Sequence, residues 1–313
     1  MIKGKIIKAI SGFFYVECDN GIIECKARGI LRKKNITPII GDNVIISTTD
    51  LNCGIIEDVM PRKTELVRPP VANIDKVFIT FAVKEPNPNL SLLDRFIVFS
   101  EKMGLDIVIL LSKVDLDENL EKTTIIVDEY SKVGYKVIPV SIVTGQNMDK
   151  VKQEMKGCTS VFAGQSGVGK SSIINSIVPE LDLETSEISH KLGRGKHTTR
   201  HAQLFKIDED TIFADTPGFS SFEINDVEED ELKHYFIEFS GLGECRFGNK
   251  CIHKNEPDCV VKEAVENNEI SKRRYESYLQ ILEEIKSYNS FGRKNREKDG
   301  IYVKSKNRKD NGR

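Results

Sequence analysis

Residues Val161–Ile177 read "VFAGQSGVGKSSIINSI". An apolar run leads into a glycine-rich turn, a Lys-Ser pair and then an apolar pattern with helical spacing. Gly164, Gly169, Lys170 and Ser171 match the G-x-x-x-x-G-K-S motif, in which backbone N–H groups surround phosphates, the Lys reaches the β- and γ-phosphates and the Ser hydroxyl binds Mg²⁺. The stretch therefore predicts the phosphate-binding loop of a nucleotide hydrolase, made by Gly164, Gln165, Ser166, Gly167, Val168, Gly169, Lys170, Ser171 and Ser172.

The bulk composition indicates a soluble globular protein of two or three domains. The chain has 313 residues, and the hydrophobic fraction of 39% with a charged fraction of 30% is ordinary for such proteins. No apolar run reaches the roughly 18 residues that a spanning helix needs, and the N-terminal residues show no secretory pattern. We therefore expect a cytoplasmic protein that does not contact membranes.

The pattern of apolar runs and turn residues divides the chain into three parts. Residues 1–68 show short apolar runs separated by Ser-Gly and Asp-Asn-Gly turns, which predict a small β-barrel, either an oligonucleotide-binding (OB) fold or an SH3-like barrel. Residues 69–225, entered through a linker at 68–73, alternate buried strands with helices, which predicts a parallel sheet with helices on both faces. Residues 226–313 read as a helical domain with a basic tail, which is either solvated or a contact for nucleic-acid phosphates.

Two further segments complete the phosphate site. In "FADTPG", Asp215 follows a short apolar strand and can hold Mg²⁺ through water, while the Gly218 N–H can face the γ-phosphate. In "GRGKHTTRH", Thr198 or Thr199 can reach Mg²⁺ and the γ-phosphate, as a switch segment requires. We assign Thr199 with Ser171 as magnesium ligands; the alternative for this segment is a basic surface loop.

A motif before the phosphate loop predicts that the base is guanine. "LLSKVD" ends a buried strand, and Asp115 can accept hydrogen bonds from guanine N1–H and the 2-amino group, which adenine does not offer. The stem of Lys113 would lie along the base, and Ser141 and Ile142 follow the next strand as a base-contacting loop. Ser112 stands where Asn is commonest, and we expect this shorter side chain to weaken the tie to the phosphate loop.

The guanine loops thus precede the phosphate loop in the chain, which is a permuted order. Binding loops of an open parallel sheet all lie at the carboxyl ends of the strands, so strand order along the chain does not change where they meet. One consequence is that Asp-Thr-Pro-Gly leads directly into the C-terminal domain, and we expect a γ-phosphate-dependent switch there to shift that domain.

The hydrolytic water has no evident partner next to the Asp-x-x-Gly motif. Phe219 occupies the position where many GTPases carry a water-orienting Gln, so we expect slow unaided hydrolysis. His197 or His201 can substitute, although either can equally be a surface histidine. Gly167 stands where some potassium-using GTPases carry Asn, which weighs against potassium dependence.

A cysteine and histidine cluster predicts one structural zinc ion. "ECRFGNKCIHKNEPDCV" has the spacing C-x5-C-x-H-x5-C, and three thiolates with one imidazole make a closed tetrahedral set. The ligands are Cys245, Cys251, His253 and Cys259. The other cysteines show no disulfide framework, which fits a reducing compartment.

Taken in order, these segments resemble the circularly permuted GTPases that depend on the small ribosomal subunit, the RsgA or YjeQ family. The resemblance covers nearly the whole chain and rests on "SKVD", "GQSGVGKSS", "GRGKHTTR", "DTPGF" and the Cys/His cluster. It implies an OB-fold barrel, a permuted P-loop GTPase domain and a zinc domain. It further implies GTP and GDP as ligands, and a role late in maturation of the small (30S) ribosomal subunit, with contacts to 16S rRNA and hydrolysis stimulated by that subunit. We expect a monomer.

Two other functions stay open on the residues alone. One is an RNA-binding or translation factor in which the nucleotide only gates affinity. The other, disfavoured by Asp115, is an ATP-using P-loop protein.

Overall fold

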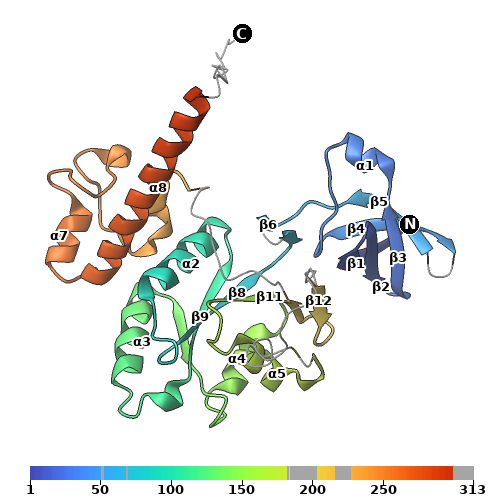
Figure 1. Cartoon of the computed structure of the whole chain (residues 1–313), viewed down its shortest axis with the longest axis horizontal. Helices are drawn as coiled ribbons and strands as arrows, with labels where there is room; N and C mark the ends of the chain where they lie inside the picture. The colour runs from blue at the N-terminus through green and yellow to red at the C-terminus, as the bar shows by residue number, and fades with distance from the viewer. Residues whose placement is uncertain (51–52, 68–69, 182, 184–202, 216–226, 299–313) are drawn as a thin grey trace. The chain divides into compact units, whose positions relative to one another are not determined.

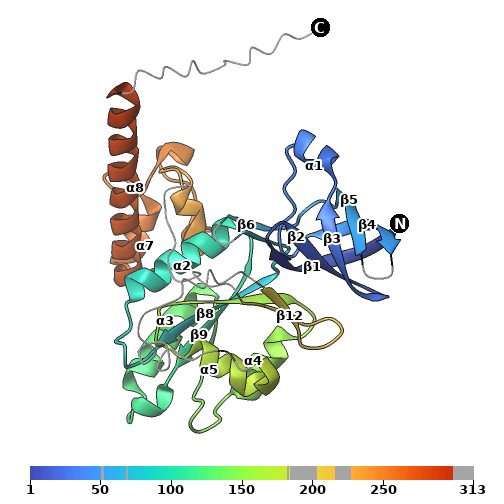
Figure 2. The same ribbon diagram turned by 45° about the vertical axis from the view of Figure 1, so that its right-hand side comes forward.

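The computed structural model describes residues 1–50, 53–67, 70–181, 183, 203–215 and 227–298. The chain forms two compact units, Met1–Phe222 and Glu223–Arg313. Figures 1 and 2 show the elements of both in two views. None of the helices among these residues combines the length and the apolar character that crossing a membrane requires.

The N-terminal part is a closed five-stranded barrel. Each strand pairs with two others in the circular order β1-β2-β3-β5-β4-β1, with β3 and β5 parallel. The strands are β1 (Ile2–Ile10), β2 (Phe13–Cys18), β3 (Gly21–Ala27), β4 (Asn43–Asp50) and β5 (Cys53–Val59). Alternate side chains such as Ile6, Val16 and Ile46 fill the interior and are fully buried. This is the predicted OB-fold barrel, with the addition of a short helix, α1 (Gly29–Lys33).

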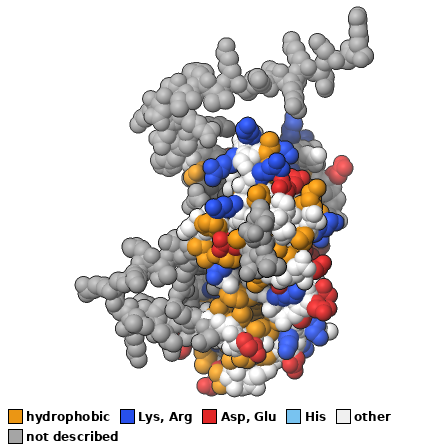
Figure 3. Space-filling model, turned by 90° about the vertical axis from the view of Figure 1, so that its right-hand side faces the viewer, with side chains coloured by type: hydrophobic (Ala, Val, Ile, Leu, Met, Phe, Trp, Pro, Cys, Tyr) orange, Lys and Arg blue, Asp and Glu red, His pale blue; other side chains and the backbone are white. Residues whose placement is uncertain are grey.

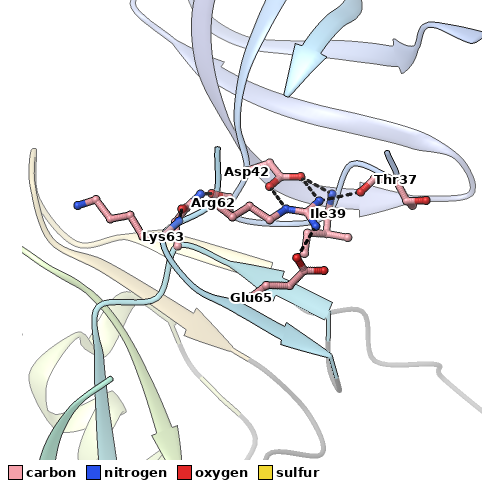
Figure 4. Close-up of polar contacts among 8 residues, drawn as sticks. Thr37, Ile39, Asp42, Arg62, Lys63 and Glu65 are labelled. Atoms are coloured by element: carbon pink, nitrogen blue, oxygen red, sulfur yellow. Dashed lines mark hydrogen bonds and ion pairs between the residues drawn. The ribbon is translucent and has the colours of Figure 1, made fainter. Parts of the chain in front are cut away.

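The segment expected to be a plain linker is a short hairpin. β6 (Glu65–Val67) pairs antiparallel with β7 (Pro70–Ala72). Arg62 ties this hairpin to the barrel: its Nε lies 2.7 Å from Asp42 Oδ1, and its guanidinium also binds Glu65 and the Thr37 carbonyl (Figure 4). The fully buried Asp42 carboxylate needs such a partner. The bonds of Arg62 therefore hold the hairpin segment in place, which its composition did not indicate.

The nucleotide-domain sheet is parallel except at one edge. Its order is β10-β9-β8-β11-β13-β12, and only β12 runs antiparallel. The strands are β8 (Lys76–Ala82), β9 (Asp106–Ser112), β10 (Lys136–Pro139), β11 (Thr159–Ala163), β12 (Gln203–Lys206) and β13 (Ile212–Asp215). β12 also pairs with β1 through Lys8 and Gln203, so the barrel and this sheet share one continuous set of strands.

Helices cover both faces of this sheet (Figure 1). On one face, α4 (Met148–Met155) and α5 (Lys170–Ile177) pack on a cluster that includes Phe78, Phe162 and Phe213. On the other, α2 (Leu90–Lys102) contacts β8 and β9, with the Phe96 ring edge-on to Phe81 at 5.8 Å between centroids. The remaining elements are α3 (Glu121–Val133), which contacts β10, and the 3₁₀ turns η1 (Val114–Leu116) and η2 (Pro179–Leu181).

The C-terminal unit is helical and small. Its elements are α7 (Val260–Glu266), α8 (Lys272–Lys298) and the 3₁₀ turns η4 (Leu232–Tyr235), η5 (Ile237–Phe239) and η6 (Gly248–Lys250). Phe236, Phe239 and Tyr278 form an aromatic core with centroids 5.0–5.4 Å apart. Arg274, almost fully buried, pairs with Glu238 through Nε and a second nitrogen.

Candidate functional site

The candidate nucleotide site lies at the carboxyl edge of the parallel sheet. β8, β9, β10 and β11 pair in register, so their ends meet at one edge. The guanine loop (residues 112–117) follows β9, the base-contacting loop (141–145) follows β10, and the phosphate loop (164–172) follows β11. Segments that are permuted along the chain are therefore neighbours in space.

The phosphate loop requires glycine where it leaves its strand. Gly164 has φ +135°, and a Cβ there would lie 2.1 Å from the Thr80 carbonyl oxygen on the adjacent strand. Gly169, with φ +94°, is the last residue before α5 begins at Lys170. Backbone N–H groups at this helix start can face an anion, and Ser171, whose role as a magnesium ligand stays a prediction, lies in the first turn.

Lys170 lies folded over the phosphate loop. Its Nζ donates to the Gly164 carbonyl at 2.7 Å and to the Gln165 carbonyl at 2.6 Å. Burial lowers the pKa of this ammonium group to about 8. A phosphate in the loop would supply the opposite charge that a buried ammonium lacks.

Ser112 joins the guanine loop directly to the phosphate loop. Its buried hydroxyl donates to the Val168 carbonyl at 2.6 Å. Ser in place of Asn still makes a direct tie, because β9 ends close enough to the phosphate loop for a one-carbon side chain to span the gap. That this tie is weaker than one from Asn stays a prediction.

Asp115 and the base-contacting loop come together beside the phosphate loop. The Ser141 hydroxyl donates to Asp115 Oδ1 at 2.5 Å and accepts from the Thr144 N–H at 3.2 Å. Asp115 itself is exposed, and the Ile142 side chain lies 4.0 Å from where a Cβ on Gly169 would be. Lys113 has φ +57° and donates through Nζ to the Glu85 carbonyl. The carboxylate is thus fixed on one side and open on the other.

The switch residues fall mostly outside the described part of the chain. Asp215 is the last residue of β13, which pairs with β11 in parallel and so ends at the same edge as the phosphate loop. Thr198, Thr199, Gly218, His197, His201 and Phe219 all lie outside the described residues. Their assigned roles remain predictions.

The structure brings the four predicted zinc ligands together. The ligand atoms of Cys245, Cys251, His253 and Cys259 all lie within 4.8 Å of one another. The His253 Nδ1 lies 3.6, 3.4 and 3.4 Å from the three sulfurs, and two sulfur pairs are separated by 3.9 Å. A tetrahedral zinc ion would give about 3.8 Å between sulfurs and about 3.6 Å from sulfur to nitrogen. The donors fit a structural zinc site.

The cluster is buried, and neighbouring groups hold its loop in place. Burial raises the pKa of Cys251 to about 12 and also raises the pKa of Cys259, so without a cation these thiols stay protonated. Neighbouring groups hold the loop: the Tyr275 hydroxyl donates to the His253 carbonyl at 2.7 Å, and the Glu256 carboxylate accepts from the Ile252 and Lys254 N–H groups. A metal would ionise the thiols and complete the site.

Comparison with known proteins decides the family. Residues 59–225 match the sequence profile of the RsgA GTPase, and residues 3–56 match that of the RsgA N-terminal domain. The chain belongs to the RsgA GTPase family. It is 48% identical over 289 residues to "Small ribosomal subunit biogenesis GTPase RsgA" of Alkaliphilus metalliredigens, an alignment that covers 91% of this chain and 98% of that protein. The protein of the same name from Halalkalibacterium halodurans is 45% identical, with 92% and 98% covered.

Solved structures of RsgA relatives have the same fold. YjeQ from Thermotoga maritima aligns with a TM-score of 0.80 and 38% identity, covering 91% of this chain and 98% of that one. YloQ, described as a circularly permuted GTPase, aligns with a TM-score of 0.78 and 36% identity, covering 92% and 96%. As an RsgA family member, this chain is a GTPase, and the expected fold of barrel, permuted GTPase domain and Cys₃His domain is confirmed.

Several supporting residues of this RsgA chain were not predicted from its sequence. Thr80 supplies the carbonyl against which Gly164 packs, Thr144 orients Ser141, and Glu256 binds the backbone of the metal loop. Thr80 and Thr144 each act through one backbone group, and Glu256 acts through bonds to the N–H groups of Ile252 and Lys254. Only Glu256 carries a sequence signal, since it lies between two of the metal ligands.

Proposed function

We propose that this chain is a GTP-hydrolysing factor in late biogenesis of the small (30S) ribosomal subunit, and that this subunit stimulates its hydrolysis. Its parts would be the barrel (1–68), the permuted GTPase domain (69–225) and the zinc domain (226–313). The names of relatives aligned over nine-tenths of the chain support the ribosomal role. The observation that carries the nucleotide assignment is the bond from Ser112 to Val168, which joins the guanine loop to the phosphate loop.

In this proposal, each loop binds one part of GTP. Asp115, oriented by Ser141, accepts hydrogen bonds from the guanine edge, while the Lys113 stem and Ile142 line the base. The phosphate loop surrounds the phosphates with N–H groups, and Lys170 moves from its two carbonyl partners to the β- and γ-phosphates.

Hydrolysis needs charge stabilisation and an oriented water. Ser171 and Thr199 would bind Mg²⁺, with Asp215 acting through water; when bound, the ion neutralises charge on the β- and γ-phosphates. Thr198 and the Gly218 N–H face the γ-phosphate. Phe219 cannot orient water, so unaided turnover is slow, and the ribosomal subunit supplies or positions the missing group, with His197 and His201 as candidates.

Contacts to 16S rRNA would use basic side chains of the barrel. Exposed cations there include Lys3, Lys26, Arg28, Arg32, Lys33 and Lys34. Figure 3 shows Lys and Arg side chains over one face of the molecule, mixed with acidic and hydrophobic ones. Such a surface can bind phosphates while leaving specificity to shape. The basic tail adds a further phosphate contact, and we propose a cytoplasmic monomer with one structural zinc ion.

The test is GTP turnover by the full chain with and without purified small ribosomal subunits. We expect slow turnover alone and a strong increase with small subunits but not with large ones. A rate that small subunits leave unchanged would contradict the stimulated-GTPase proposal. Subunit binding that depends on GTP without any change in turnover would favour the nucleotide-gated RNA-binding alternative.

A further inference from the structure

The loop that follows β8, residues 83–89, lies against the guanine loop although it belongs to none of the nucleotide motifs. The Val83 N–H donates to the Ser112 carbonyl at 3.0 Å. Lys84 Nζ donates to the Leu116 carbonyl at 2.6 Å, and Lys113 Nζ donates back to the Glu85 carbonyl. The two loops are therefore joined at the start of the guanine loop, through Ser112 and Lys113, and near its end, through Leu116.

Lys84 acts at the end that lies next to Asp115. Leu116 is the neighbour of Asp115 in the single 3₁₀ turn η1, so a bond to the Leu116 carbonyl limits rotation of the turn that carries the carboxylate. Lys84 is half-buried, which favours one side-chain position over many.

The same turn is anchored on its far side by Asp117. This buried carboxylate accepts from the Thr123 N–H and from the Thr123 hydroxyl, both at 2.8 Å. Its pKa is lowered, chiefly by the Thr123 N–H and in the same direction by the charges of Lys84 and Lys122. Lys84 thus donates to the Leu116 carbonyl and also acts by its charge on the next residue, Asp117, while Asp115 just before them stays exposed.

We infer that Lys84 is a positioning residue for guanine recognition: its bond to the Leu116 carbonyl holds the Asp115 carboxylate in the plane where it accepts two hydrogen bonds from the base. This inference rests on the proposed reading of guanine by Asp115. A carboxylate that accepts two parallel bonds needs its angle fixed to within about 10–20°, since a small rotation lengthens both bonds. Loosening η1 therefore lowers discrimination at the base edge more than it lowers phosphate binding.

Inosine diphosphate separates positioning from general stability. It keeps the phosphates, the sugar and N1–H of GDP but lacks the 2-amino group, so it can make only one of the two bonds to Asp115. A merely structural loss would weaken GDP and inosine diphosphate equally. A loss of positioning weakens GDP more, because GDP depends on both bonds.

The experiment measures the dissociation constants of both nucleotides for the full chain and for Lys84→Met, which keeps most of the aliphatic stem but removes the charge. We expect the preference for GDP over inosine diphosphate to fall by about 3- to 10-fold, the range for one lost ordinary hydrogen bond, because the bond to the 2-amino group is weakened and not removed. Lys84→Arg should recover most of the preference. The matched control is Lys132→Met, which removes an exposed ammonium group from the last turn of α3 and should change nothing.

An unchanged preference in Lys84→Met overturns the inference, even if both affinities or the melting temperature fall. If Lys84→Met does not fold, Lys84→Gln supplies the same comparison, since its shorter neutral side chain cannot make the charged contact. Asp115→Asn tests the underlying assignment separately. If that variant keeps the wild-type preference for GDP, the guanine assignment fails whatever Lys84 does; if it loses that preference while Lys84→Met keeps it, only the positioning role fails.

Discussion

The phosphate loop and the Cys/His cluster are both short, glycine-containing segments, but they are held in place by different means. The phosphate loop leaves a fully buried strand and is fixed by backbone contacts to Thr80 and by the Ser112 hydroxyl. The Cys/His loop has regular structure only at η6 and is backed by a small aromatic core. Contacts to the sheet hold the first, whereas we expect the second to need a metal to ionise its buried thiols. The comparison teaches that a large sheet can preorganise a ligand site, while a small domain with little core gains most from a ligand that forms part of its fold.

Removing the metal should produce the largest effect and should be confined to the C-terminal unit. Structural zinc sites contribute on the order of 10 kcal/mol to folding, more than a small unit can lose. In Cys251→Ser, or after chelation, we expect hydrogen-exchange protection of residues 232–285 to collapse while residues 76–178 keep theirs. Cys158→Ser, a cysteine outside the cluster, is the control. If the C-terminal unit keeps its hydrogen-exchange protection without metal, its fold does not depend on the metal and the two regions do not differ in this respect.

A methyl group at Gly164 should distort the phosphate loop by a steric clash with the adjacent strand and so destabilise the protein. Gly164→Ala places a Cβ 2.1 Å from the Thr80 carbonyl oxygen at φ +135°. We expect a loss of about 3 kcal/mol in unfolding free energy, against about 1 kcal/mol for Gly167→Ala, where φ is also positive but a Cβ meets nothing within 4 Å. Urea denaturation of both variants checks this, and equal losses would mean that the Thr80 contact does not fix the loop.

Lys170→Ala should separate binding from folding. A buried ammonium group costs folding free energy, so its removal should leave the melting temperature unchanged or higher. Affinity for GDP should fall about 100-fold, because the phosphates lose their charged partner. Calorimetric titration measures this, with the exposed Lys152→Ala as the control. If Lys170→Ala binds GDP as tightly as the wild type does, the phosphates do not contact Lys170.

Ser112→Ala should give the smallest effect. Loss of the hydrogen bond to Val168 removes about 1 kcal/mol, so GDP should bind about fivefold more weakly. The control is Ser100→Ala, which removes an equally buried hydroxyl that bonds to the Phe96 carbonyl within α2, away from the site. If Ser100→Ala weakens GDP as much, the effect is one of stability and not of loop coupling.

The sequence predicts those parts of the architecture that depend on local residue patterns. Alternating apolar runs predicted the barrel and β8 to β11, and fixed motif spacing predicted which loops contact one another. The metal ligands were predicted because thiolates and imidazole at short spacing have few other uses.

The rest depended on tertiary contacts that carry little local signal. The β6–β7 hairpin forms because Asp42 and Arg62, distant in sequence, meet beside it. The pairing of β1 with β12 rests on one residue pair, Lys8 and Gln203, and the bond of Lys84 to Leu116 reaches a single backbone carbonyl. The bond from Ser112 to Val168 could not be predicted either, because the reach of a side chain matters only relative to a gap that the sequence does not give.

The central claim is that loops scattered and permuted along the chain bind one guanine nucleotide. Asp115→Asn tests it most directly, since an amide at this position offers a donor to the 2-oxo group of xanthine and one acceptor fewer to guanine. Competition between xanthosine diphosphate and GDP should show a preference that shifts by about 100-fold toward xanthosine diphosphate, with phosphate-loop binding intact. A variant that binds GDP as the wild type does, and still rejects xanthosine diphosphate, would contradict the account.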